Sequence, residues 1–359
     1  MTGIGGVGPQ SRRRVARAVQ LAPEVARRPD PASACKPRWR AQRQALALLA
    51  MLQMASIGAT EPDAAQALAA MTTAVRSLDY QGSFIYEHDG RIDALRIFHA
   101  AGIGARERER LVRMSGPRSE IVREGASITI LQSGAPTVLL ANRAGARLLP
   151  LVPDAPAAAL APSYQVSLAG EDRVAGYPAR IVDIAPHDGY RYGYRLWLAD
   201  ATHLLLRSQV RDAANHNLEQ FMFVALDIGA KPRESDLASS SDAGVTTAPQ
   251  EQPLDGNPHW HVADAPPGFV FLRAQRPAQG PPNAEHQLYT DGLASVSVYI
   301  EPGADTAAVV DGATIRGALN IYTHRDGGWK FTALGDVPRV TVERMARSVK
   351  AANTSSAAP

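Results

Sequence analysis

The sequence of 359 residues is poor in the features that usually indicate enzyme chemistry. Its one cysteine is Cys35, so the chain that follows can form no disulfide and offers no thiol nucleophile. The chain contains no Walker loop, G-x-S-x-G elbow, H-E-x-x-H or C-x-x-C motif. Gly3, Gly5 and Gly8 match G-x-G-x-x-G, but no strand precedes them. We therefore predict no enzyme activity, no catalytic residue and no cofactor.

The sequence also lacks a recognisable metal-binding motif. His259 and His261 flank Trp260, and a two-residue spacing on a strand puts both rings on one face. A zinc site usually needs three or four protein ligands, and no further histidine lies nearby in the sequence. We expect packing or surface histidines here and predict no metal site.

Long hydrophobic runs are also missing. The apolar run Ala45–Leu52 is well short of the roughly 20 residues that span a bilayer, and no later stretch is longer. It follows the basic residues Arg38, Arg40 and Arg43 and precedes the small residues of 56–59, which is the pattern of a secretory signal peptide. We predict a leader over residues 1–59, with the signal peptide at about 38–59, and export from the cytoplasm.

The positive charge of the chain is concentrated in this leader. Residues 1–59 contain ten Lys and Arg against Glu24 and Asp30. Subtracting these from the 38 basic and 35 acidic residues of the whole chain leaves 28 basic and 33 acidic residues in 60–359. Binding to a phosphate backbone depends on clustered basic residues. The acidic remainder argues against nucleic acid as a partner.

The remainder begins with a helical pattern and continues with strands. Apolar residues recur at helical spacing over 64–78, and from Tyr80 the period changes to two, leading to the turn dipeptide Asp89-Gly90. Turn signals then punctuate short strand-like segments as far as Ile228, which indicates an antiparallel meander or barrel. We predict a barrel domain over residues 60–229.

The segment Tyr190–Leu198 has the clearest alternation in the chain. Its tyrosines and leucines point one way, while Arg191, Arg195 and Trp197 point the other. A curved sheet with such a face can enclose an apolar ligand, and a fully packed core needs the same inward residues. If the sheet encloses a ligand, the residues that we expect to line the site are Phe84, Tyr86, Tyr190, Tyr192, Tyr194, Leu196 and Met222.

A second domain follows a polar segment. Residues 230–256 have few large apolar residues and many Ser, Asp and Pro, which predicts a linker. Strand patterns resume from His259, and Thr341–Lys350 has the pattern of a short helix. We predict a smaller α+β domain over 257–351 and a disordered tail over 352–359.

Alternating charges over Arg106–Arg110 could form a docking strip for a charged partner. Cross-strand pairing on a solvated strand is the simpler interpretation, since each such pair stabilises by only tenths of a kcal/mol. We favour the solvated strand.

Several stretches resemble the RseB/MucB family of periplasmic regulators. The resemblance is strongest over 190–229, with R-Y-G-Y-R-L-W at 191–197 and L-E-Q-F-M-F at 218–223. It extends to G-P-R at 116–118, to L-Y-T-D-G-L-A at 288–294 and to G-D-V-P at 335–338. The resemblance spans about residues 64–350. This chain departs from the family at Thr202-His203, where Thr-Gly is usual, and near Asn215, where an Asp/Gly turn is usual.

This resemblance implies an α+β fold, with an N-terminal half-open antiparallel barrel of the lipoprotein-carrier type, packed helices and a smaller C-terminal α+β domain. It implies a periplasmic protein that binds the periplasmic part of a transmembrane anti-sigma factor and protects it from regulated proteolysis. Lipopolysaccharide or an acylated lipoprotein would release it. A homodimer is left open.

Two other functions compete with this one. A lipid or lipoprotein carrier would use the same barrel, but it would not need a second domain. A periplasmic hydrolase is disfavoured because its signatures are missing. For contacts with a protein partner we select residues of the types that dominate interfaces, namely arginine and aromatic residues. They are Arg118, Tyr289, Tyr299 and Trp329.

Overall fold

The computed structural model describes residues 64–352 apart from 103–106, 126, 133–156, 240–244, 248–250, 255, 278–279 and 304–311. The predicted leader, most of the apolar segment 147–162 and the tail after Ala352 lie outside the described residues. Within those residues, no helix is long and apolar enough to cross a membrane. The described residues belong to one compact unit.

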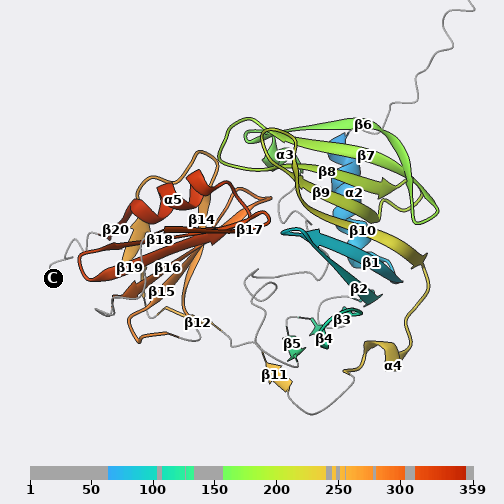
Figure 1. Cartoon of the computed structure of the whole chain (residues 1–359), viewed down its shortest axis with the longest axis horizontal. Helices are drawn as coiled ribbons and strands as arrows, with labels where there is room; N and C mark the ends of the chain where they lie inside the picture. The colour runs from blue at the N-terminus through green and yellow to red at the C-terminus, as the bar shows by residue number, and fades with distance from the viewer. Residues whose placement is uncertain are drawn as a thin grey trace, which may run out of the picture. The chain divides into compact units, whose positions relative to one another are not determined.

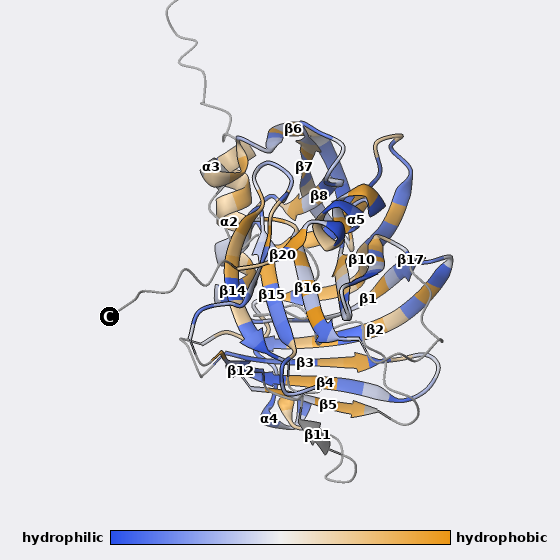
Figure 2. Ribbon diagram, turned by 90° about the vertical axis from the view of Figure 1, so that its left-hand side faces the viewer, coloured by the Kyte–Doolittle hydropathy of each residue, from blue (hydrophilic) through white to orange (hydrophobic). Residues whose placement is uncertain are grey.

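A large antiparallel sheet occupies the first part of this unit (Figure 1). Its strand order is β11-β5-β4-β3-β2-β1-β10-β9-β8-β7-β6, so that β1 and β10 pair in the middle. The strands are β1 (Tyr80–His88), β2 (Arg91–Ala100), β3 (Arg108–Arg113), β4 (Ser119–Glu124), β5 (Ser127–Gln132), β6 (Tyr164–Val174), β7 (Tyr177–Pro186), β8 (Gly193–Ala199), β9 (Leu205–Arg211), β10 (Asn217–Ile228) and β11 (Val245–Thr247). Figure 2 shows hydrophobic and hydrophilic residues together along these strands, as a sheet with one buried face requires.

The helix α2 (Ala64–Ser77) covers part of this sheet. Leu68, Met71 and Val75 lie on one stripe of the helix and are fully buried. The helix packs against β6, β7 and the short helix α3 (Ala157–Leu160). The predicted helix and the predicted switch from helix to sheet are confirmed.

The hairpin turns predicted at Asp89-Gly90, at Thr202-His203 and near Asn215 are present in the structure. Asp89 and Gly90 have φ of 51° and 68°, the left-handed conformation that a tight two-residue hairpin needs. His203 and Asn215 have φ of 59° and 63°, so both hairpins form with residues other than glycine. The hydrogen bond from Asn215 N to Asp212 O closes the second turn.

The second part of the unit is a smaller α+β domain, as predicted. Its sheet has the order β12-β14-β15-β16-β19-β18-β17, and a two-stranded sheet joins β13 to β20. The helix α5 (Arg339–Arg347) packs against one face through Val342 and Met345. The strands are β12 (Gln252–Pro253), β13 (Trp260–Val262), β14 (Val270–Arg276), β15 (Glu285–Thr290), β16 (Ser295–Pro302), β17 (Gly312–Arg316), β18 (Leu319–Asp326), β19 (Trp329–Gly335) and β20 (Val349–Ala351).

Three predicted elements need correction. The final helix ends at Arg347, and Val349 belongs to β20 because that segment pairs with β13. The predicted linker contains the helix α4 (Glu234–Leu237), which packs on β2 and β3. Leu237 is buried against these strands, and Arg108 forms a bidentate salt bridge with Glu234. The strand predicted from Tyr190 begins only at Gly193.

Candidate functional site

The inward face of the large sheet carries most of the predicted ligand-lining residues. Phe84, Tyr194 and Leu196 are at most 4% exposed and belong to one hydrophobic cluster. The ring of Phe84 meets those of Phe221 and Phe223 edge to face, with centroids 4.9 and 5.7 Å apart. Aromatic side chains therefore fill the space in front of β1 and β10.

Tyr86 lies on the same face and has a polar partner. Its hydroxyl donates to Glu219 Oε2 at 2.6 Å, and its ring stacks on His88. The other oxygen of Glu219 accepts from the backbone N of Ala318, at 3.0 Å, in the smaller domain. Tyr86 therefore lies where the interior of the large sheet meets the second domain.

Met222 was assigned to the wrong face. It pairs with Ile85 on β1 and Arg207 on β9, whereas Phe221 and Phe223 pair with Tyr86 and Phe84. Because successive side chains on a strand alternate, Met222 lies on the side opposite Phe84. The inward residues missing from the prediction are Phe221 and Phe223, and the continuous apolar run from Phe221 to Leu226 gives no local signal that separates their face from that of Met222.

Tyr190 and Tyr192 contact the second domain. The backbone carbonyl of Tyr190 accepts a hydrogen bond from the Thr341 hydroxyl at 2.6 Å. The phenol oxygen of Tyr190 accepts a hydrogen bond from Arg344 Nη1, also at 2.6 Å. The Tyr192 hydroxyl accepts from Asn320 Nδ2 at 3.0 Å. Asp188 accepts the backbone N–H of Tyr190 and so forms a bend, which is why the strand starts after these residues.

Arg191 is the centre of this contact. Its Nη1 donates to Asp291 Oδ2 at 2.8 Å, and both side chains are completely buried. The Tyr164 hydroxyl donates to the same oxygen at 2.9 Å, and the guanidinium lies over the rings of Tyr164 and Phe269. Burial, with the neighbouring Tyr194 and the Asp291 charge, raises the pKa of Tyr164 far above its ordinary value. The sequence pattern predicts only that Arg191 points away from the tyrosines, because no local pattern identifies a partner 100 residues away.

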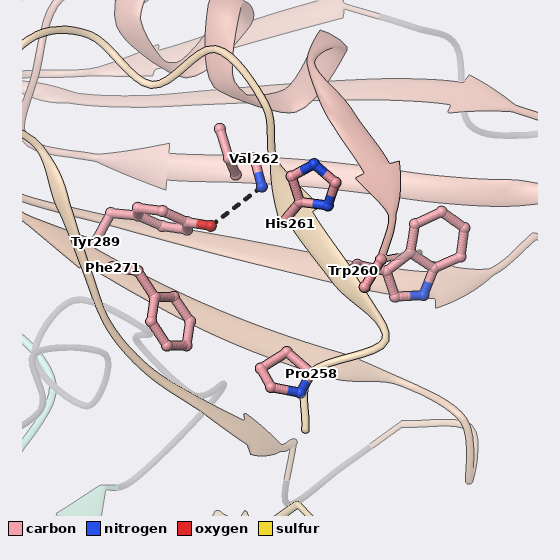
Figure 3. A pocket seen from close by; sticks show the side chains of 7 residues that line it. Pro258, Trp260, His261, Val262, Phe271 and Tyr289 are labelled. Atoms are coloured by element: carbon pink, nitrogen blue, oxygen red, sulfur yellow. Dashed lines mark hydrogen bonds between the residues drawn. The ribbon is translucent and has the colours of Figure 1, made fainter. Parts of the chain in front are cut away.

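A pocket of about 430 Å³ opens on the smaller domain. Pro258, Trp260, His261, Val262, Phe271, Tyr289 and Ala352 line it. Figure 3 shows Phe271 and Tyr289 on one side and Pro258 on the other. The Tyr289 hydroxyl accepts from the backbone N of Val262 at 3.1 Å and donates to Gln287 Oε1 at 2.8 Å. Burial raises the pKa of Tyr289.

The predicted partner-binding residues are divided among three places. Tyr289 lines the pocket, and Trp329 packs edge to face against the pocket residue Trp260, with ring centroids 4.8 Å apart. Tyr299 lies on the opposite face of the sheet and stacks on His286. Burial, followed by the charges of Glu251 and Glu301, raises the pKa of Tyr299 to about 12. Arg118 lies on the large sheet, just before β4, with its side chain 61% exposed.

One buried cluster combines metal-ligand types. His99 Nε2 lies 3.3 Å from Glu107 Oε1 and 3.8 Å from Glu109 Oε1. Arg123 already pairs with both carboxylates, at 2.7 and 2.6 Å. An arginine charge between the carboxylates disfavours a cation there. The predicted cross-strand pairing of this segment is confirmed, but the solvated strand is wrong because Glu109 is fully buried.

Family models match both parts of the chain. The model described as the MucB/RseB N-terminal domain matches residues 63–241, and that of the MucB/RseB C-terminal domain matches residues 255–350. The Sigma factor AlgU regulatory protein MucB of Pseudomonas aeruginosa is 33% identical over 84% of this chain and 96% of its own length. This chain belongs to the MucB/RseB family.

More distant members and solved structures agree. The Sigma-E factor regulatory protein RseB of Escherichia coli K12 is 27% identical over 84% of this chain and 94% of its own length. The crystal structure of MucB in complex with MucA(peri) is similar with a TM-score of 0.64 and 31% identity, covering 80% of this chain and 99% of that chain. The complex structure of Pseudomonas aeruginosa MucA/MucB is similar with a TM-score of 0.65 and 32% identity, covering 80% of this chain and 98% of that chain. The predicted family and fold class are confirmed.

Proposed function

We propose that this MucB/RseB family member is a periplasmic regulator of an envelope-stress sigma factor. It binds the periplasmic part of a transmembrane anti-sigma factor and protects that segment from regulated proteolysis. The likeness to MucB in complex with MucA(peri), over 80% of this chain, is the observation that carries the proposal. The names of the relatives as sigma factor regulatory proteins support it.

The proposed activity is binding rather than catalysis. The chain lacks the usual catalytic motifs. Among the described residues, the one cluster of metal-ligand types is the set His99, Glu107 and Glu109, which Arg123 neutralises in part. A regulator that works by covering a cleavage site needs neither a nucleophile nor a metal.

An acylated ligand is the proposed release signal. Lipopolysaccharide or a lipoprotein would enter the large sheet beside Phe84, Tyr86, Tyr194 and Leu196 and displace part of the aromatic cluster. Tyr86 bonds to Glu219, which bonds to Ala318 of the smaller domain. A ligand that moves Tyr86 therefore changes the free energy of the domain contact, and this is how its binding would couple to release of the partner.

Protection from proteolysis tests the proposal. The periplasmic segment of the anti-sigma factor from the same organism is incubated with the protease that initiates envelope-stress signalling, with and without the full chain. The expected result is slower cleavage that saturates as the chain is added, and recovery of cleavage on adding lipopolysaccharide. Unchanged cleavage at saturating chain would overturn the proposed function.

A further inference from the structure

The first half of β14 exposes three consecutive apolar side chains. Val270, Phe271 and Leu272 are 61%, 47% and 55% exposed. Adjacent exposed apolar residues are costly in a soluble protein and usually mark a surface that something else covers. The run is therefore a candidate docking surface.

The backbone of the same segment is open for pairing. β12 pairs only with Gln275 and Arg276 of β14, whereas β15 pairs along the other side from Val270, with a bulge at Leu272. Across the described part of the chain, no strand lies beside the outer edge of Val270–Ala274. An unpaired edge with apolar side chains is a template for an added strand.

A place for one side chain of such a strand lies next to this edge. Phe271 forms one wall of the pocket, and its ring meets that of Tyr289 edge to face, with centroids 5.7 Å apart. Pro258 forms the opposite wall (Figure 3). Pockets beside an added strand give peptide recognition its side-chain specificity, while the backbone gives it affinity.

The rim of this surface is basic. Lys350 and His261 pair with each other on β20 and β13 beside the pocket, whereas Arg273 of β14 pairs with Leu288 and so lies on the face of the sheet opposite Phe271. Among the ion pairs of the described residues, none neutralises Lys350. Acidic residues flanking an apolar core would complement this rim.

The surface also continues into the contact between the two sheets. Phe269, directly before Val270, lies under the guanidinium of Arg191, with 5.1 Å between its ring centroid and Arg191 Cζ. A strand on β14 therefore ends beside the buried Arg191–Asp291 pair. This position would let one occupant respond to a change in the domain contact.

We propose that the anti-sigma factor's periplasmic segment docks here, as an extended strand added to β14 at Val270–Ala274. One apolar side chain enters the pocket beside Phe271, and acidic residues flank it. The proposal rests on the proposed function, because that function supplies the partner.

Paired variants of the full chain test this surface. V270D/L272D places two charges on the docking edge at side chains that are more than half exposed, so folding should be retained. I315D is the matched control, because Ile315 is 59% exposed on β17, at the opposite edge of the same sheet. Melting temperatures within a few degrees of the parent confirm folding. The probe is a synthetic peptide of the anti-sigma factor's periplasmic segment, titrated by calorimetry.

The parent chain and I315D should bind the peptide equally well, and V270D/L272D at least tenfold more weakly. Equal binding by V270D/L272D would overturn the docking surface and leave the proposed function standing. An absence of binding by the parent chain would overturn both. If V270D/L272D instead abolished self-association and left peptide binding unchanged, the edge would be an interface between copies and the proposal would be wrong.

Backbone N-methylation of the peptide provides a second readout. Methylation removes one amide donor without changing a side chain, and only alternate amides of an added strand face the edge. When a single N-methyl group is placed at each successive position of the peptide in turn, binding should be weakened at every second position. Uniform tolerance of N-methylation would exclude strand addition.

Discussion

At the scale of single residues, the structure depends on polar groups buried away from water. Arg191 and Asp291 are both fully buried, and Asp291 Oδ1 also accepts the backbone N–H groups of Leu293 and Ala294. A buried pair of this kind fixes geometry more than it adds stability, but the loss of one member leaves an uncompensated charge. Arg191 therefore defines how the large sheet contacts the smaller domain.

R191M should destabilise the chain by about 3 kcal/mol, because Asp291 would keep its charge without a cation. Urea unfolding followed by circular dichroism measures the loss. The matched control is R344M, since the Arg344–Asp264 pair is 31% and 59% exposed and screened by water. Equal losses from the two variants would contradict the role given to Arg191.

Tyr299 should make stability depend on alkaline pH. Its folded pKa of about 12 lies above the value of about 10 for an unfolded tyrosine, so folding favours the protonated phenol. The stabilisation is complete below pH 10 and is lost as the pH rises from 10 to 12. Between pH 9.5 and 11.5 the parent should lose roughly 2 kcal/mol more than Y299F in urea unfolding. Parallel losses would refute the raised pKa.

At the scale of elements, alternation and turn chemistry explain most of what could be predicted. The helix at 64–77 and the hairpin at Asp89-Gly90 follow from local patterns, and both form. Met222 was misplaced because the run from Phe221 to Leu226 is continuously apolar, so period two alone does not say which set points inward. The register with β1 decides this, and register is not a local property.

This assignment of faces predicts different costs for two neighbouring truncations. F221A should cost about 3–5 kcal/mol, because Phe221 is 1% exposed within the aromatic cluster. M222A should cost less than half of that, because Met222 is only partly buried on the other face. Urea unfolding of both variants distinguishes the faces, and a larger loss for M222A would show that the register is wrong.

At the scale of the whole molecule, the two domains and the family could be predicted, but the contact between the domains could not. The sequence pattern predicts that Tyr190 and Tyr192 belong to a strand. Their hydrogen-bond partners lie more than 120 residues away in the sequence and are Thr341, Arg344 and Asn320. The polar segment between the domains was read as a linker because it has few large apolar residues. Its helix α4 forms because Arg108 and Arg110 of β3 hold it in place.

The large sheet and the smaller domain are linked through buried side chains such as Arg191 and Asp291. The central claim is that the chain binds an anti-sigma factor and that an acylated ligand weakens this binding. The most direct measurement is a calorimetric titration of the full chain with the anti-sigma factor's periplasmic segment, repeated with lipopolysaccharide. The account predicts saturable binding that lipopolysaccharide weakens. Lipid binding without any binding of the anti-sigma segment would contradict it and would identify a carrier instead.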